Sequence, residues 1–197
     1  MDDIAFNYGS LRAHEARFGV MAHGVLATAL PWVCGLLILL GAAIIGLLGV
    51  AFGWVLVALA VVPGMLHVYY KGHITVLPKG KDRTIDSRVA GDVLGRLPKN
   101  ATPADIAAAA GSVSSGLFMA ARFGLTPSLL TSLASSDQSA TPALWKLADE
   151  IRQKNGLEQI TGSVLAVALV RSFGNYESVI AQMHIDDADL DAGIQWQ

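Results

Sequence analysis

Residues 24–70 read GVLATALPWVCGLLILLGAAIIGLLGVAFGWVLVALAVVPGMLHVYY, and no Asp, Glu, Lys or Arg occurs among them. An α-helix rises about 1.5 Å per residue, so about 20 residues cross the roughly 30 Å hydrocarbon layer of a membrane. The stretch is long enough for two such spans. We therefore predict a transmembrane helical hairpin, with spans near Pro31–Val50 and Trp54–Tyr70. Its turn is expected around Ala51–Gly53, and because this connection is so tight, a re-entrant pair that does not fully cross is the alternative.

Aromatic residues near the ends of the two predicted spans indicate where the spans meet the membrane surfaces. Trp and Tyr side chains favour the membrane–water interface. Trp32, Tyr69 and Tyr70 are expected at one interface. Trp54 is expected at the other, together with Phe52. The Trp and Tyr residues of this set are the predicted membrane-interface sites.

Basic residues flank the apolar stretch on both sides, and they are Arg12, Arg17, Lys71, Lys79, Lys81 and Arg83. Positive charge marks the cytoplasmic ends of membrane spans. A single span would place one basic flank outside, whereas a hairpin keeps both inside. The prediction is a multi-pass protein of a bacterial inner membrane, with both termini and the C-terminal domain in the cytoplasm. The stretch follows an N-terminal segment that contains Asp2, Asp3 and Glu15, so we expect a retained anchor rather than a cleaved secretory signal.

The composition of the 197 residues is 53% hydrophobic and 15% charged, and the apolar stretch accounts for this bias. Residues 1–81 carry 5 Lys/Arg and 3 Asp/Glu, whereas residues 82–197 carry 9 and 13, so the C-terminal part is acidic. An acidic part argues against nucleic-acid binding, which needs a basic patch. The lone Cys34 argues against a disulfide framework and a cysteine-based metal site. His67 and His73 lack a metal-binding partner spacing, which favours interfacial or linker histidines over metal or haem ligands.

Four segments follow from these features: a juxtamembrane N-terminal segment (1–23), the hairpin (24–70), a linker (71–85) and a helical domain (86–197). In the first segment, a helix is expected to start after Ser10. One interpretation lays this helix against the headgroups, with Arg12 and Arg17 facing lipid phosphates. The other interpretation is a frayed N-terminus.

Three Thr-Pro dipeptides punctuate the helical domain, at Thr102–Pro103, Thr126–Pro127 and Thr141–Pro142. A Thr at the N-cap accepts a hydrogen bond from a free backbone N–H of the first turn. A Pro at the first helical position loses nothing, since that N–H has no intrahelical partner. Each dipeptide therefore predicts a helix start.

Further helices are indicated downstream by apolar periodicity. The helix that starts at Thr141 is expected to stop at Asn155–Gly156. The segment Ser163–Val170 is apolar on every side, which predicts a helix in the centre of a bundle. Another helix is expected over Tyr176–His184. The last helix begins with acidic residues that are interpreted as caps rather than ligands or catalysts, namely Asp186, Asp187 and Asp189.

The helical domain contains an internal repeat at an offset of 60 residues. In this self-alignment, residues 119–130 align with residues 179–190, and residues 104–110 align with residues 164–170. The apolar pairs are Met119/Val179, Phe123/Met183, Leu125/Ile185 and Leu130/Leu190. Two such units predict an all-α chain, in which the hairpin is followed by one bundle of about eight short helices.

The second copy reads ALWKLADEIRQKNGLEQITGSVLAVALV over residues 143–170 and NYESVIAQMHIDDADLDAGI over residues 175–194. This order of helices and loops, and its duplication, resembles the Clp N-terminal repeat domain (Clp R) of Clp-type ATPase chaperones. The resemblance covers residues 86–197. The family commonly has a His where this chain has Ser163, so the resemblance implies a fold and a broad role and assigns no protein-binding residue.

Catalytic motifs are missing from the sequence. The phosphate loop of an ATPase requires GxxxxGK[ST], and GLEQITGS at Gly156–Ser163 lacks both the spacing and the Lys. No GxSxG motif and no paired carboxylates on a predicted cleft occur either. We expect no enzyme activity, no cofactor, no metal and no small-molecule substrate.

The resemblance implies a membrane-anchored module that binds protein substrates or adaptors for a Clp-type ATPase, in chaperone action or proteolysis. The ATPase would be a partner or the continuation of a longer chain. The alternative is a structural subunit of a membrane complex, such as a secretion or envelope assembly, since glycines let membrane helices approach closely at Gly35, Gly41, Gly46 and Gly49. A small transporter or channel is disfavoured, because two spans without an intramembrane charge offer no ion path unless many copies assemble.

Overall fold

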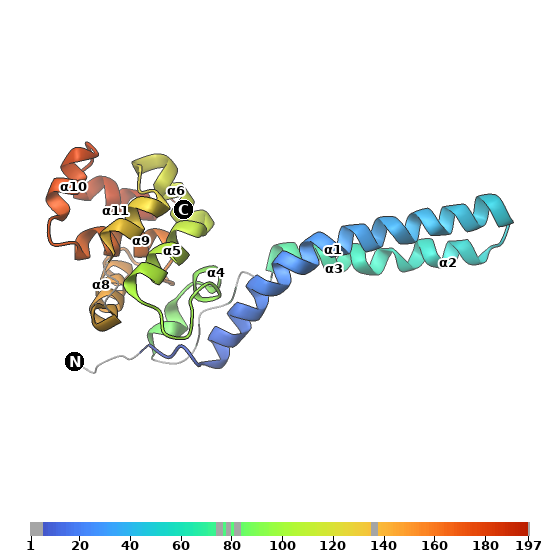
Figure 1. Cartoon of the computed structure of the whole chain (residues 1–197), viewed down its shortest axis with the longest axis horizontal. Helices are drawn as coiled ribbons and strands as arrows, with labels where there is room; N and C mark the ends of the chain where they lie inside the picture. Colours follow the sequence, from blue (N-terminus) through green and yellow to red (C-terminus); the bar gives the residue numbers. More distant parts are fainter. Residues whose placement is uncertain (1–5, 74–76, 78–79, 81–83, 135–137, 197) are drawn as a thin grey trace. The chain divides into compact units, whose positions relative to one another are not determined.

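The computed structural model describes residues 6–73, 77, 80, 84–134 and 138–196, with the backbone alone at 70–73 and 138. Among these residues all regular secondary structure is helical, apart from one isolated parallel bridge between Val89 and Ile160. The predicted all-α class is confirmed. The chain forms two compact units (Figure 1): the hairpin, Phe18–Leu77, and the helical domain, which combines Met1–Arg17 with Pro78–Gln197.

The helices follow one another in the order shown in Figure 1, where η marks a 3-10 helix: α1 (Leu11–Leu48), α2 (Phe52–Leu59), α3 (Val61–His73), η1 (Ile85–Arg88), α4 (Gly91–Leu94), α5 (Pro103–Ser112), α6 (Ser114–Phe123), α7 (Pro127–Leu133), η2 (Gln138–Ala140), α8 (Thr141–Lys154), α9 (Gly162–Ser172), α10 (Tyr176–Gln182) and α11 (Asp187–Gln195). Two stretches are long and apolar enough to cross a membrane: α1 (Leu11–Leu48) and Phe52–Tyr69, which covers α2 and most of α3.

The hairpin turns between Leu48, the last residue of α1, and Phe52, the first residue of α2. Gly49 adopts a left-handed φ of 65°, which glycine reaches without strain and which commonly ends a helix. The turn predicted at Ala51–Gly53 therefore lies too far along the chain, since Phe52 and Gly53 are already helical.

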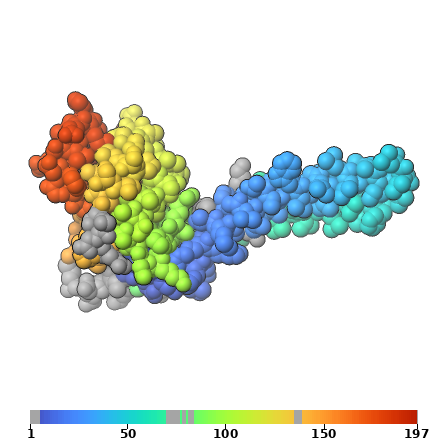
Figure 2. Space-filling model, viewed as in Figure 1, coloured from blue at the N-terminus to red at the C-terminus, as the bar shows by residue number. Residues whose placement is uncertain are grey.

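The two arms of the hairpin approach closely at a pair of glycines. A Cβ on Gly41 would lie 2.7 Å from the Gly53 carbonyl oxygen, and a Cβ on Gly53 would lie 2.5 Å from the Gly41 oxygen. Farther from the turn, the Cys34 thiol donates to the Ala60 carbonyl at 3.3 Å. In the space-filling view the side chains of α1 and α2 lie against each other (Figure 2). Gly35 and Gly46, two of the glycines expected to permit close approach, have no such neighbour within 4 Å.

The core of the helical domain is built around α9, in which all residues from Gly162 to Val170 are buried. Helices α5, α6, α7, α8, α10 and α11 all contact α9. The prediction that Ser163–Val170 is a central helix is confirmed. Two pairs of consecutive helices, α5–α6 and α9–α10, are also long and apolar enough for a bent membrane span, with bends of 85° and 116°. The buried residues of α5 and α9, however, form the core of the helical domain.

The predicted repeat is visible in the helices, because α5, α6 and α7 correspond to α9, α10 and α11 at the 60-residue offset. Corresponding residues also share their local conformation. Gly124 and His184 both adopt a left-handed φ, of 71° and 54°. Thr126 and Asp186 both cap the next helix, accepting a hydrogen bond from the backbone N–H three residues on, at 3.3 and 2.7 Å. In the first copy, the region that corresponds to the long helix α8 contains only the short helices η1 and α4 among the described residues.

The Thr-Pro dipeptides mark helix starts, as predicted. Thr102 and Thr126 are N-caps, and Thr102 forms a capping box with Asp105. Thr141 differs, because its hydroxyl donates to the Ala101 carbonyl at 3.2 Å. The third Thr therefore connects the two copies instead of capping its own helix.

The described residues of the N-terminal segment up to Arg17 pack within the helical domain. Phe6 stacks on Trp145 with ring centroids 4.4 Å apart, and Trp145 Nε1 donates to the Tyr8 hydroxyl at 3.1 Å. Arg12 Nη2 donates to the Val89 carbonyl at 2.8 Å. The helix starts after Ser10, as predicted, and runs into the hairpin without a break.

Two expectations for this segment are wrong. Arg12 and Arg17 do not face lipid phosphates, since both donate to backbone carbonyls of the helical domain, Arg17 Nε to Leu97 at 3.0 Å. The described residues of the segment are not frayed either. Apolar periodicity missed this because the buried residues of the first turns are Ala13 and Ala16, whereas the larger Leu11 is exposed.

Candidate protein-binding groove

A groove of about 640 Å³ lies in the helical domain where the two copies meet. Its walls come from the start of α5, the end of α7, helix α8 with the preceding Ala140, and the end of α9. The lining residues are Pro103, Ser132, Leu133, Ala134, Ala140, Ala143, Leu144, Leu147, Ser172, Phe173 and Gly174. The volume is in the range typical of ligand sites.

Among the residues that the structure describes, none of those lining the groove is charged. Its two serine hydroxyls are engaged as donors within their own helices, Ser132 to the Leu129 carbonyl at 2.7 Å and Ser172 to the Leu169 carbonyl at 2.8 Å. Such a surface suits apolar side chains of a ligand, because burying a charge there would leave it without a partner.

Two of the Thr-Pro helix starts build this groove. Pro103 lines it at the start of α5, and α8 begins beside it at Thr141. The hydrogen bond from Thr141 to the Ala101 carbonyl fixes the start of α8 beside the start of α5. The Thr-Pro dipeptides at 102–103 and 141–142 could therefore be recognised in the sequence, but they predicted helix starts and not a binding surface.

Helix α8 is anchored on the side away from the groove by Asp149. Its carboxylate accepts from Arg88 Nη1, Arg152 Nε and Gln153 Nε2, each at 2.7 Å. Burial alone would raise the pKa of Asp149, but hydrogen bonds from Arg152 and Gln153 and the positive charges of Arg152 and Arg88 outweigh it. The pKa of Asp149 therefore lies below its ordinary value.

A second carboxylate, Asp191, joins α8, α9 and α11. It accepts from Lys154 at 2.8 Å and from Arg171 at 3.0 Å. Burial opposes ionisation, but these two cations prevail and lower the pKa of Asp191. At the start of α11, Asp186 and Asp189 form a capping box, which confirms that these two acidic residues are caps. Asp187 instead pairs with Arg171 at 3.1 Å.

Within the described residues no group of three or more His, Cys, Asp or Glu is placed to hold a metal ion. His67 lies in α3, where its Nδ1 is buried without a hydrogen-bond partner among the described atoms. The side chain of His73 lies outside the described residues.

The predicted membrane-interface residues lie on the hairpin, where Trp32, Trp54 and Tyr69 are exposed, while the side chain of Tyr70 lies outside the described residues. Cys34 contacts Ala60, and Gly41 contacts Gly53. These two contacts fix the register of the antiparallel arms, that is, which residues of one arm lie level with which residues of the other. Trp32 and Trp54 are then about 12 Å apart along the hairpin axis, at about 1.5 Å per residue. Belts at opposite interfaces require about 30 Å. The interface role of each residue stays a prediction, but the structure does not give the spacing expected for this pair.

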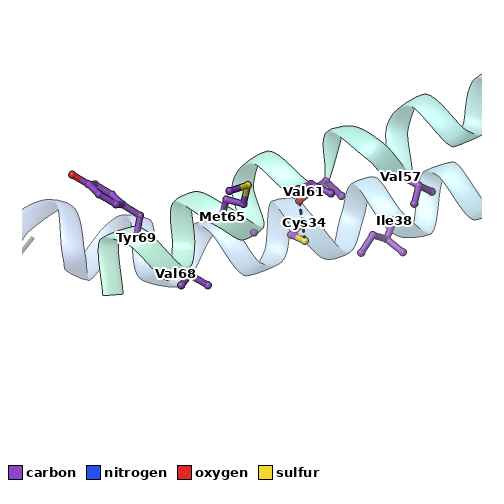
Figure 3. Close-up of a pocket in the computed structure, with 9 residues that line it drawn as sticks. Cys34, Ile38, Val57, Val61, Met65, Val68 and Tyr69 are labelled. Carbon is purple, nitrogen blue, oxygen red and sulfur yellow. Dashed lines mark hydrogen bonds between the residues drawn. The ribbon is translucent and has the colours of Figure 1, made fainter. Parts of the chain in front are cut away.

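A second apolar groove, of about 780 Å³, runs along the hairpin between α1 and the arm formed by α2 and α3 (Figure 3). Three of its lining residues are small, Cys34, Ala60 and Gly64. The larger residues around them are Ile38, Val57, Val61, Met65, Val68 and Tyr69.

Comparison with models of known protein families, with curated proteins and with solved structures finds no match to this chain. The resemblance to the Clp N-terminal repeat therefore stays a prediction based on the residues and their duplication.

Proposed function

We propose that this chain is a membrane-anchored protein-interaction module, in which the hairpin is the anchor and the groove between the two copies binds an apolar segment of a protein partner. The groove of about 640 Å³, whose described lining residues carry no charge, supports this proposal. Apolar pockets rimmed by a few polar groups are the usual recognition sites for amphipathic helices and extended segments. No catalytic role is assigned to any residue.

The finer proposal is that the partner is a Clp-type ATPase, or one of its adaptors or substrates. The duplicated order of helices and the paired left-handed residues Gly124 and His184 support a double repeat of the Clp N-terminal kind. Since the sequence has no phosphate loop, the energy for unfolding a substrate would come from the ATPase.

We further propose that both ends of the hairpin face the cytoplasm of a bacterial cell. Support comes from the helical domain, which contains residues from before and after the hairpin, because one folded unit cannot lie on both sides of a membrane. Anchoring the groove there would restrict recognition to proteins at the membrane and raise their effective concentration.

Leu147→Asp tests this function, because it places a carboxylate in the groove at a half-buried position. Leu117→Asp is the matched control, since Leu117 is 51% exposed on α6 and does not line the groove. Mild crosslinking and pull-down from membranes should recover a Clp-type ATPase, adaptor or shared substrate with wild type and control. The groove variant should lose at least about nine-tenths of it, as expected for burying an unpaired charge. Recovery of none of these with wild type would refute the Clp link.

The alternative function, a structural subunit of a membrane complex, is favoured by the hairpin groove. Its small residues Ala60 and Gly64 would let the transmembrane helix of another subunit approach closely. Stoichiometric co-purification with fixed partners in detergent would support this alternative over transient binding of substrates.

A further inference from the structure

Two aromatic residues of the N-terminal segment, Phe6 and Tyr8, pack against Trp145 of helix α8. The Phe6 ring stacks on Trp145 at 4.4 Å with an interplanar angle of 24°, and the Phe6 and Tyr8 rings lie 4.2 Å apart. The indole Nε1 of Trp145 donates to the Tyr8 hydroxyl at 3.1 Å. As a result Trp145, the largest side chain of α8, is only 1% exposed. We call Phe6 and Tyr8 the N-terminal clasp.

The clasp is held in place by Arg17 of α1 and by Asp86. Arg17 Nη2 donates to the Tyr8 carbonyl at 3.0 Å, and its Nε donates to the Leu97 carbonyl at 3.0 Å. The backbone N–H of Asn7, between the two clasp residues, donates to Asp86 Oδ1 at 3.2 Å. The segment therefore has a defined conformation on the helical domain and is attached at several independent points.

The clasp and the groove use opposite sides of α8. Consecutive helical residues are separated by about 100°, so residues two positions apart lie about 200° from each other. Ala143 and Leu147 line the groove, whereas Trp145 meets the clasp and Asp149 meets Arg88. A displacement of α8 toward or away from the clasp therefore changes the width of the groove.

We propose that the N-terminal clasp positions α8 and so sets the affinity of the groove for apolar segments, an inference that rests on the groove being the binding site. Phe6 and Tyr8 are positioning residues, since neither lines the groove. With the clasp closed, the groove has the shape seen here. With the clasp open, α8 loses the stacking and the hydrogen bond of Trp145, while the ion pair of Asp149 with Arg88 remains on that side. Only the closed fraction of molecules then binds with full affinity.

The apparent dissociation constant of such a site is the intrinsic one divided by the binding-competent fraction. A variant that leaves about a tenth to a third of the molecules closed raises Kd about threefold to tenfold. We expect this range for Phe6→Ala and the lower end of it for Tyr8→Phe, which removes only the hydroxyl.

The test uses the full chain in phosphatidylcholine nanodiscs and a dansyl-labelled, uncharged peptide of alternating leucine and serine as probe. Fluorescence anisotropy gives Kd, and the indole N–H resonance of Trp145 reports whether the clasp is closed. Phe52→Ala and Tyr176→Phe are the matched controls, because they remove the same groups from the hairpin and from α10. Leu147→Asp in the same nanodiscs corrects for peptide bound to lipid.

Tyr8→Phe and Phe6→Ala should shift the Trp145 resonance and raise Kd, while both controls leave the two readouts unchanged. In a double-mutant cycle, the effects of Tyr8→Phe and Trp145→Phe on Kd should be less than additive, because they remove the same hydrogen bond. A shifted resonance with unchanged Kd would overturn the clasp proposal and leave the proposed function standing. If wild type and Leu147→Asp bind the probe equally, the proposed function fails, and the clasp proposal fails with it. Should Phe6→Ala unfold, Tyr8→Phe alone decides.

Discussion

At the scale of single residues, Asp149 stands out because three donors from two segments converge on one carboxylate. Its side chain is 9% exposed, so these interactions are screened less than those of a surface ion pair. Removing the charge leaves Arg88 and Arg152 without this anionic partner. Asp149 therefore contributes to the stability of α8 as well as to its position.

Asp149→Asn should lower the free energy of unfolding of the helical domain by about 2 kcal/mol, the size expected for hydrogen bonds to a charged group. Urea unfolding in detergent, followed by circular dichroism, measures the change. Glu150→Gln is the control, because Glu150 is the exposed neighbour on the same helix. Equal stability of Asp149→Asn and wild type would contradict the role assigned to this carboxylate.

The same pair of proteins gives a pH dependence with a defined sign. The folded-state pKa of Asp149 is lower than the ordinary carboxyl value of about 4. Its contribution is therefore complete above about pH 4 and is lost as the pH falls through the folded-state pKa. Wild type should lose stability more steeply than Asp149→Asn in that acidic range.

At the scale of elements, the hairpin depends on which glycines face each other. The sequence offers Gly35, Gly41, Gly46 and Gly49, and nothing in their spacing tells which of them packs against the other arm. The structure assigns Gly41 to close packing with Gly53 and Gly49 to the turn, while Gly35 and Gly46 stay open. The existence of the hairpin was predictable from length and hydropathy, whereas its contacts depend on the register between the arms.

Gly53→Val should separate the arms, because its Cβ would meet the Gly41 carbonyl at 2.5 Å, and overpacking of this kind costs about 1–3 kcal/mol. Cys34 is the lone cysteine, so the rate of its labelling by a membrane-permeant maleimide reports the separation. Labelling should accelerate in Gly53→Val and stay at the wild-type rate in Gly46→Val, because a Cβ at Gly46 meets nothing within 4 Å. Equal rates in the two variants would show that the glycine contact does not hold the arms together.

Helix starts and the repeat were also accessible from the sequence, because capping residues act locally. Thr102 and Thr126 cap as predicted. Thr141 does not cap its helix, since its hydroxyl donates a hydrogen bond to the carbonyl of Ala101, 40 positions away. Local chemistry therefore predicted where α8 starts, and a tertiary contact decided what its first side chain does.

At the scale of the whole molecule, the helical domain is assembled from both sides of the hairpin sequence. Tyr8 and Trp145, 137 positions apart, share a hydrogen bond, and Arg12 reaches a carbonyl 77 positions away. No periodicity or motif encodes such pairs, which is why the sequence left two interpretations for the N-terminal segment, a helix against the headgroups or a frayed N-terminus. The groove was missed as a set of residues for the same reason, since its walls come from four helices of two copies.

A photo-crosslinking amino acid placed at position 147 in membranes of living cells tests most directly whether the groove binds a protein partner. Leu147 lines the groove, and the same amino acid at the exposed position of Leu117 is the control. Irradiation should yield a discrete adduct with a Clp-type ATPase, an adaptor or a substrate from position 147 and no such adduct from position 117. No adduct at position 147, or the same adducts from both positions, would contradict a binding role for the groove.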